Sequence, residues 1–348
     1  EDSHGRIGVD VEVFGPYTLP GKLHEYGYDG FNSPQSTFCP EGDQCGKNIR
    51  GDGGALWRAD IGCSGGLCGF DNGFYVTAGH DESSTWEEFG SMLFAEREDV
   101  PDVFGPPRDA DGNPPRDQNG NVMPNWANTR YVDWTSWRAA ANHWPNAGGG
   151  TSTQAESSGQ SVFAHEFSHL RGLPDNYNNP FADNIRNYTG YWEMMSRGTF
   201  NGPGGTHNRW QIPNAGGSAL GPHHMVRFKQ SLGVLAEEDQ VRLNRSELAS
   251  DGIAVASLKA RSSIPNGDTV AMEVNFDDGG FQPGKCQADN PEDPGFWCHS
   301  STNWQNYTLE VVDRVGNDSF VPGHGVLLAQ TRSSGTPRVW MEDANPGF

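Results

Sequence analysis

The stretch that decides how this chain folds and acts runs from residue 165 to residue 175 and reads His165-Glu166-Phe167-Ser168-His169-Leu170-Arg171-Gly172-Leu173-Pro174-Asp175. Two histidines four residues apart on a helix project from one face, so both imidazoles can reach one ion. Gly172 permits a sharp turn after the helix, and Asp175 can then return to the same ion as a third ligand. Three protein ligands leave one tetrahedral position of a zinc ion open for water, as in catalytic sites.

Glu166 provides a carboxylate beside this predicted zinc site. It can hydrogen-bond a zinc-bound water, whose pKa the metal lowers toward ~7. Glu166 can then take the proton from that water and pass it to a leaving amine. The segment therefore predicts hydrolysis of an amide bond by attack of zinc-bound water, with Glu166 as general base and acid.

Periodicity predicts the elements around this segment. A helix is expected from about Thr153 to Leu170, because its apolar residues recur at three- and four-residue spacing. A second helix is expected over residues 221–235. Short alternating runs predict strands at residues 73–80, 130–137, 253–258, 269–274, 307–312 and 325–331.

The decisive segment resembles the H-E-x-x-H-x-x-G-x-x-D pattern of metzincin-type zinc peptidases. It most resembles the immune inhibitor A group, the M6-like peptidases, in which a G-Y-W-x-x-M-S-x-G segment follows. This chain has that segment at residues 190–198, and the resemblance extends over about residues 73–235 and, more weakly, 305–345. It implies a secreted zinc endopeptidase that hydrolyses internal peptide bonds of proteins or glycoproteins.

The resemblance also implies roles for further residues. Met195 would be the methionine of the Met-turn, a hydrophobic floor beneath the zinc, and Met194 would take that place if the register is off by one. Most metzincins have histidine where this chain has Asp175, whereas aspartate is typical of the M6-like group. This departure leaves Asp183 as an alternative third ligand.

Other aromatic side chains can reach the predicted site. Tyr191 or Tyr188 can donate a hydrogen bond to the oxyanion that forms on attack, although burial as packed aromatic residues is an open alternative for both. Four histidines can line the substrate groove or serve a structural role: His80, His207, His223 and His224.

A loop rich in oxygen ligands is predicted between residues 101 and 125. Calcium takes six to eight oxygens from such loops, and the spacing here does not match an EF-hand. A solvated, turn-rich loop is an equal alternative. M6-like peptidases commonly bind structural calcium, so the resemblance favours a calcium ion in this protein. The candidate ligands are Asp109, Asp111, Asn113 and Asp117.

Charge and cysteine content limit the function classes. The 348-residue chain has 24 basic and 45 acidic residues and a net charge of −21, which disfavours nucleic acid and anionic membranes as partners. No stretch is long and apolar enough for a membrane span. The six cysteines fall into close pairs, which predicts an oxidising, extracellular compartment and three short disulfides: Cys39 with Cys45, Cys63 with Cys68, and Cys286 with Cys298.

These features together predict an α+β protein. By its resemblance, a metzincin-like catalytic domain with a twisted mixed sheet and an active-site helix occupies residues 71–235. Residues 1–70 form a disulfide-stapled segment of that catalytic unit, and residues 236–348 form an antiparallel, β-sandwich-like module. We expect a monomer that acts on proteins. Two alternatives stay open: a glycoprotein- or carbohydrate-binding module with a vestigial zinc site, and a zinc hydrolase of non-peptide amides or esters.

Overall fold

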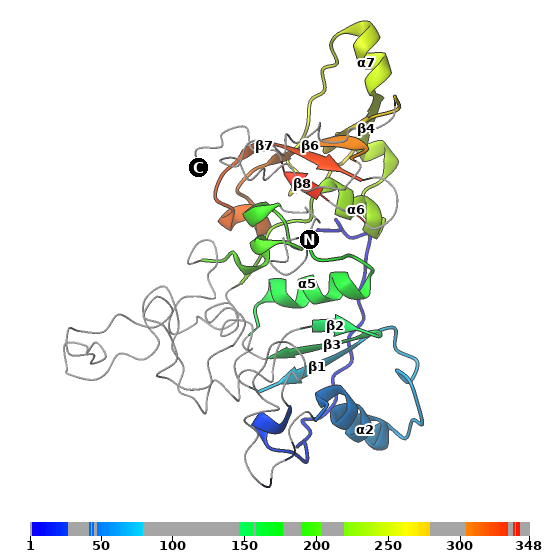
Figure 1. Ribbon diagram of the computed structural model, residues 1–348, viewed down its shortest axis with the longest axis vertical. Helices are drawn as coiled ribbons and strands as arrows, with labels where there is room; N and C mark the ends of the chain where they lie inside the picture. The colour runs from blue at the N-terminus through cyan, green and yellow to red at the C-terminus, as the bar shows by residue number, and fades with distance from the viewer. Residues whose placement is uncertain are drawn as a thin grey trace, which may run out of the picture. The chain divides into compact units, whose positions relative to one another are not determined.

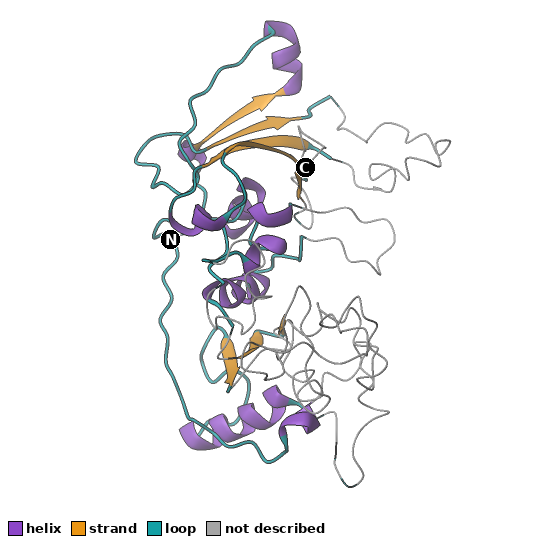
Figure 2. Ribbon diagram, turned by 90° about the vertical axis from the view of Figure 1, so that its left-hand side faces the viewer, coloured by secondary structure: helices purple, strands orange, loops and turns teal. Residues whose placement is uncertain are grey.

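The structure is a computed structural model of the chain (Figure 1). It describes residues 2–26, 42, 44, 47–78, 146–155, 158–176, 189–203, 219–278, 304–332, 337 and 339–341. Helices and strands are both present, which confirms the α+β class (Figure 2).

The chain divides into two compact units. The N-terminal unit comprises Asp10–Leu170 and Asn208–Ala219. The C-terminal unit comprises Glu1–Val9, Arg171–His207 and Leu220–Phe348. The predicted division at residues 70 and 235 stays a prediction.

A three-stranded sheet forms the centre of the N-terminal unit. Strand β1 (Gly73–Thr77) pairs in parallel with β3 (Thr151–Ala155), and β3 pairs antiparallel with β2 (Asn146–Gly148). Helix α5 (Gln160–Leu170) lies on one side of this sheet and α2 (Ile49–Ile61) on the other (Figure 1). Two strands were predicted for this region: β1 matches residues 73–80, and residues 130–137 lie outside the described part of the chain.

The structure corrects the predicted start of the active-site helix. Residues 151–155 form β3, and α5 begins only at Gln160. Strand β3 pairs on both of its edges, and Ser152 and Ala155 are both 0% exposed. Threonine and serine have low helix propensity, and sheet pairing and burial stabilise this segment as a strand.

Helix α2 lies in the segment of residues 1–70, for which no helix was predicted, and three glycines fall within it. The side chain of Asn48 accepts a hydrogen bond from the Gly51 amide at its start, and Gly62 ends it with φ 71°. A Cβ atom on Gly53 would lie 3.1 Å from the ring of Tyr75 on β1. The glycine thus allows α2 to approach the sheet closely.

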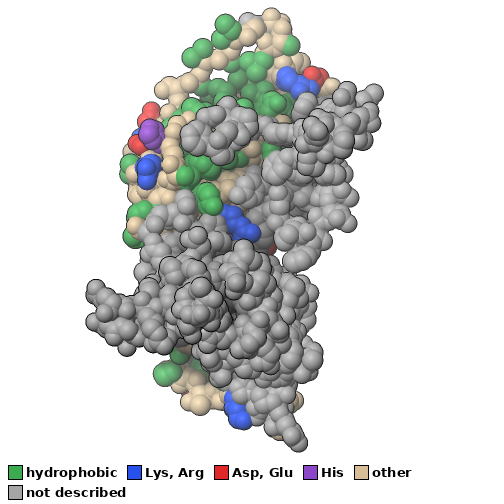
Figure 3. All heavy atoms as spheres, turned by 60° about the vertical axis from the view of Figure 1, so that its left-hand side comes forward, with side chains coloured by type: hydrophobic (Ala, Val, Ile, Leu, Met, Phe, Trp, Pro, Cys, Tyr) green, Lys and Arg blue, Asp and Glu red, His purple; other side chains and the backbone are tan. Residues whose placement is uncertain are grey.

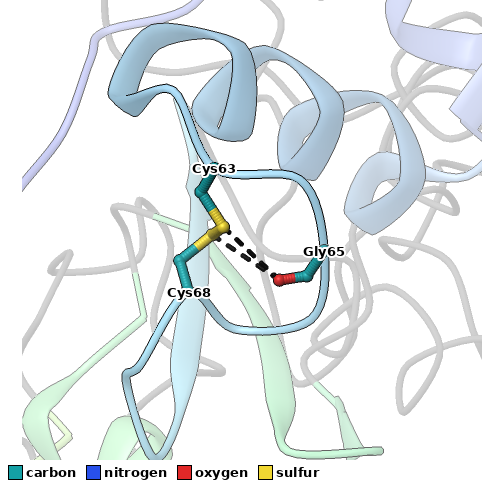
Figure 4. Close-up of a disulfide and its surroundings, with 3 residues drawn as sticks. All are labelled: Cys63, Gly65 and Cys68. Atoms are coloured by element: carbon teal, nitrogen blue, oxygen red, sulfur yellow. Dashed lines mark hydrogen bonds between the residues drawn. A yellow bond between two sulfur atoms is a disulfide. The ribbon is translucent and has the colours of Figure 1, made fainter.

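A disulfide between Cys63 and Cys68 follows α2, with the Cα atoms 5.9 Å apart (Figure 4). The two sulfur atoms lie 3.4 and 3.8 Å from the carbonyl oxygen of Gly65. This predicted pairing is confirmed. The other four cysteines lie outside the described residues: Cys39, Cys45, Cys286 and Cys298.

A five-stranded sheet in the order β4-β5-β6-β7-β8 forms the centre of the C-terminal unit. Strands β4 and β5 are parallel and the other neighbours antiparallel, so the sheet is mixed and the prediction of an antiparallel one is wrong. The described residues form no second sheet facing it, as a β-sandwich needs, and that architecture stays a prediction. The strands are β4 (Gln240–Asn244), β5 (Ala271–Asn275), β6 (Asn306–Val312), β7 (Gly325–Thr331) and β8 (Val339–Met341).

Short helices surround this sheet. Helix α6 (Val226–Leu232) contacts β6 and lies within the predicted helix 221–235, but Gly233, with φ 70°, ends it early. None of the described helices is long and apolar enough to cross a membrane. The remaining helices in the described part of the chain are η1 (Leu23–Tyr26) in the N-terminal unit, and η3 (Gly190–Trp192), η4 (Arg197–Phe200), η6 (Glu237–Asp239), α7 (Arg245–Asp251) and η7 (Gly316–Phe320) in the C-terminal unit.

Three predicted strands match β5, β6 and β7, whereas the predicted strand over residues 253–258 is wrong. That segment is a loop in which Ile253 and Val255 are 81% and 91% exposed. Its alternating side chains are typical of a strand, but the described residues offer it no pairing partner. Hydrophobic side chains exposed on the surface of this unit are visible in Figure 3.

Candidate metal centre

Helix α5 brings His165 and His169 together, as their spacing predicted. Their Nε2 atoms are 3.1 Å apart, and their ring planes meet at 86° with centroids 4.7 Å apart. His165 is 7% exposed, and His169 is half-buried. Two imidazole nitrogens therefore converge on one point at the edge of the helix.

Glu166 completes a cluster of three side chains that could hold a metal ion. It is 6% exposed, and one ligand atom from each of His165, Glu166 and His169 lies within 4.8 Å of the other two. Imidazole nitrogens and carboxylate oxygens are donors that zinc accepts. Within the described ranges, this is the one such group of three side chains.

The separation of the two imidazoles fits a zinc ion. Tetrahedral zinc with nitrogens at about 2.0–2.1 Å places two of them about 3.3–3.4 Å apart. The observed separation of 3.1 Å is close to this value, so both rings could bind one ion after a small adjustment.

The start of α5 is fixed by a contact with Ala219 in the same unit. The Ser161 amide donates to the Ala219 carbonyl oxygen at 3.1 Å. A Cβ atom on Gly159 would lie only 2.4 Å from that oxygen. The absence of a side chain at Gly159 therefore lets the helix begin at this place.

Asp175 lies in the C-terminal unit and is half-buried, and its assignment as third ligand stays a prediction. The next residue, Asn176, is 0% exposed. Its backbone amide donates to the Met195 carbonyl oxygen at 2.6 Å. The side chain of Asn176 donates to Thr189 Oγ1 at 2.8 Å and to the carbonyl oxygen of Val339 at 3.2 Å.

Both methionines considered for the Met-turn are buried. Met195 is 0% exposed and Met194 4% exposed. The backbone contact with Asn176 links Met195 directly to the segment that carries Asp175. The role of Met195 beneath a metal stays a prediction.

His223 and His224 are buried and paired with acids, which favours the structural alternative for both. His224 Nδ1 lies 2.8 Å from Glu193 Oε1, and His223 Nδ1 lies 2.7 Å from Asp2 Oδ1. Burial alone would lower the pKa of His224, but the Glu193 carboxylate raises it above its usual value. Burial alone would raise the pKa of Asp2, but Lys229 and His223 hold it well below its usual value.

Sequence reasoning missed the acidic partners Asp2 and Glu193, since neither stands at a motif spacing from the histidines.

Tyr191 is half-buried, and its carbonyl oxygen accepts a hydrogen bond from Asn201 Nδ2 at 2.7 Å. Its proposed contact with an oxyanion stays a prediction. The other candidates lie outside the described residues: His80, Asp109, Asp111, Asn113, Asp117, Asp183, Tyr188 and His207.

A family model described as the catalytic domain of immune inhibitor A peptidase M6 matches residues 142–216. We call residues 142–216 the M6 segment, after the family model that they match. This M6 segment includes α5 with its His-Glu-His cluster, and it also includes Asp175 and Met195. A second family model, described as a middle domain, matches residues 231–347, which contain β4 to β8.

A protein of Arthroderma benhamiae named "Putative secreted metallopeptidase" is 45% identical over 350 residues. The alignment covers 99% of this chain and 48% of that protein, so the chain spans about half the length of the curated relative it matches. No solved structure matches the chain. The M6 segment and this relative agree with the resemblance that residues 165–175 and 190–198 indicated.

Proposed function

We propose that this chain is a zinc-dependent endopeptidase of the M6 type. The observation that carries the proposal is the convergence of His165, Glu166 and His169 in one cluster on α5, within the M6 segment. The name of the Arthroderma relative supports a metallopeptidase activity.

His165, His169 and Asp175 would hold the zinc ion, above a floor formed by Met195. A bound zinc ion polarises the scissile carbonyl group and lowers the pKa of water. Glu166 would take the proton from the attacking water at its carboxylate and deliver it to the leaving nitrogen. Burial of Glu166 supports this role, because water is displaced from around the carboxylate and its electrostatic effect on a nearby proton is stronger.

We infer that the substrates are extracellular proteins. The relative is named as secreted, and the Cys63–Cys68 disulfide is typical of proteins from oxidising compartments. Cleavage would then occur outside the cell.

The substitution Glu166→Gln tests the mechanism, because glutamine keeps the shape of the side chain but cannot accept the proton. We expect zinc content to stay at the wild-type level while casein cleavage falls by about 10²–10⁴-fold. Glu238→Gln, on an exposed glutamate of η6, is the control and should leave both quantities unchanged.

Retained cleavage by Glu166→Gln would refute the assigned proton transfer. A zinc-loaded wild-type protein that cleaves no member of a peptide library would favour a vestigial binding module. Cleavage of esters without cleavage of peptides would indicate a non-peptide hydrolase.

A further inference from the structure

Asn176, which follows the turn after α5, is fixed by several buried hydrogen bonds. It is 0% exposed and connects three separate segments of the C-terminal unit. Its amide binds the Met195 carbonyl oxygen, and its Nδ2 binds Thr189 Oγ1. Thr189 is also 0% exposed, so this contact is closed to solvent.

The third segment is the edge strand β8. Asn176 Nδ2 donates to the Val339 carbonyl oxygen, and Asn176 Oδ1 accepts from the Val339 amide, both at 3.2 Å. The primary amide thus binds both backbone groups of one residue, as a neighbouring strand would. Strand β8 pairs with β7 on its other side, so Asn176 occupies the free edge of the sheet at this position.

The residue that receives this support directly follows Asp175. Adjacent Cα atoms are about 3.8 Å apart, so a shift of Asn176 necessarily moves the backbone of Asp175. Metal sites require their ligands to be held within roughly 0.5 Å of the productive position. The backbone bond of Asn176 to Met195 and its side-chain bonds to Thr189 and Val339 restrict the backbone next to Asp175.

We propose that Asn176 is the positioning residue for Asp175, and that strand β8 in turn holds Asn176 through Val339. This inference rests on the proposed function, in which Asp175 is the third zinc ligand. It assigns to the edge strand β8 a part in orienting Asp175 through Asn176, beyond packing within the C-terminal unit.

The test measures the zinc dissociation constant of purified full-length variants by competition with a chromophoric chelator. Circular dichroism at the same temperature gives the folded fraction, and the constants are referred to folded protein. We expect Asn176→Ala to weaken zinc binding by about 10–100-fold, the effect typical of residues that orient ligands. Thr189→Val, which removes one acceptor at nearly constant volume, should weaken it by a smaller factor.

Asn306→Ala is the matched control, because Asn306 on β6 is also 0% exposed and lies in the same unit. The side-chain amide of Asn306 makes no hydrogen bond to the described residues, so its truncation should leave the zinc constant within about threefold. If Asn176→Ala does not fold, Thr189→Val alone decides, and a wild-type zinc constant in that variant would overturn the inference.

Asp175→Asn separates this inference from the proposed ligand set. If Asp175→Asn weakens zinc binding and folded Asn176→Ala does not, the positioning role is refuted and the proposed function stands. If Asp175→Asn leaves the zinc constant unchanged, the ligand set itself is wrong, and the inference fails with it. Weakening by both Asp175→Asn and Asn176→Ala, with Asn306→Ala unaffected, supports the inference.

Discussion

Arg261 and Glu310 lie 3.5 Å apart, measured between Nη1 and Oε2, and their side chains are 2% and 1% exposed. Burial raises the pKa of Glu310 to about 7, even though Arg261 and Lys229 lower it. The pKa of Asp318 is lowered despite its burial, because Arg261 binds Asp318 Oδ2 at 2.9 Å and Oδ1 at 2.8 Å. The guanidinium therefore stabilises the charge of Asp318 more than that of Glu310.

The raised pKa of Glu310 predicts that stability falls as pH increases. The unfolded chain ionises this group near 4.5, whereas the folded protein keeps the proton until about pH 7. The contribution of Glu310 is therefore fully present below pH 4.5 and is lost as pH rises through about 7. Glu310→Gln removes this dependence, so the free energy of unfolding of the variant relative to wild type should increase between pH 5 and pH 8.

Urea denaturation at both pH values checks this prediction, because the difference between them cancels effects of the substitution that do not depend on pH. Glu238→Gln, at an exposed position, should give the same difference as wild type. A constant offset between Glu310→Gln and wild type across this range would contradict the raised pKa.

Gly159→Ala should destabilise the N-terminal unit by about 1–3 kcal/mol, the usual cost of overpacking. The added Cβ would lie 2.4–2.6 Å from Ala219, including backbone atoms that cannot rotate away. Gly51→Ala in α2 is the control, because its Cβ would meet Asn48 at 3.4–3.8 Å, an ordinary contact. That variant should gain about 0.5–1 kcal/mol from helix propensity. Equal stabilities of the two variants in denaturant titrations would refute the close packing at the start of α5.

Replacing both Cys63 and Cys68 by serine should cost about 2 kcal/mol, because the crosslink closes a short loop in the unfolded chain. The two residues are separated by 5 positions. Guanidinium denaturation of the double variant measures the loss, and zinc content should remain at the wild-type level. A loss of zinc on removal of this disulfide would show that the segment after α2 supports the metal centre.

The convergence of His165 and His169 on one face of α5 was predictable from sequence, because their spacing of four residues determines their geometry on any helix. The start of the helix was not, since Thr151–Ala155 becomes a strand only by pairing with β1 and β2. Helix α2 was not predictable either, because its glycines have low helix propensity. Their small size instead allows the helix to approach Tyr75 on β1 closely.

The long-range hydrogen bonds of Asn176 and His223 could not be predicted from local sequence patterns. Asn176 finds Val339 at a sequence separation of 163 residues, and Asp2 finds His223 at a separation of 221. Such pairs are specified by the fold of the C-terminal unit, whereas a motif specifies only neighbours within a few residues. Strand β6 shows the same limit, because its polar residue Glu310 is buried beside Val226 and Arg261 from distant segments.

The most direct test of the metal centre is anomalous diffraction at the zinc edge from crystals of the zinc-saturated protein. We predict one strong peak within bonding distance of Nε2 of His165 and Nε2 of His169, with a carboxylate oxygen of Asp175 completing the protein ligands. A peak elsewhere, with no density between the two imidazoles, would contradict the assignment of this chain as a zinc peptidase.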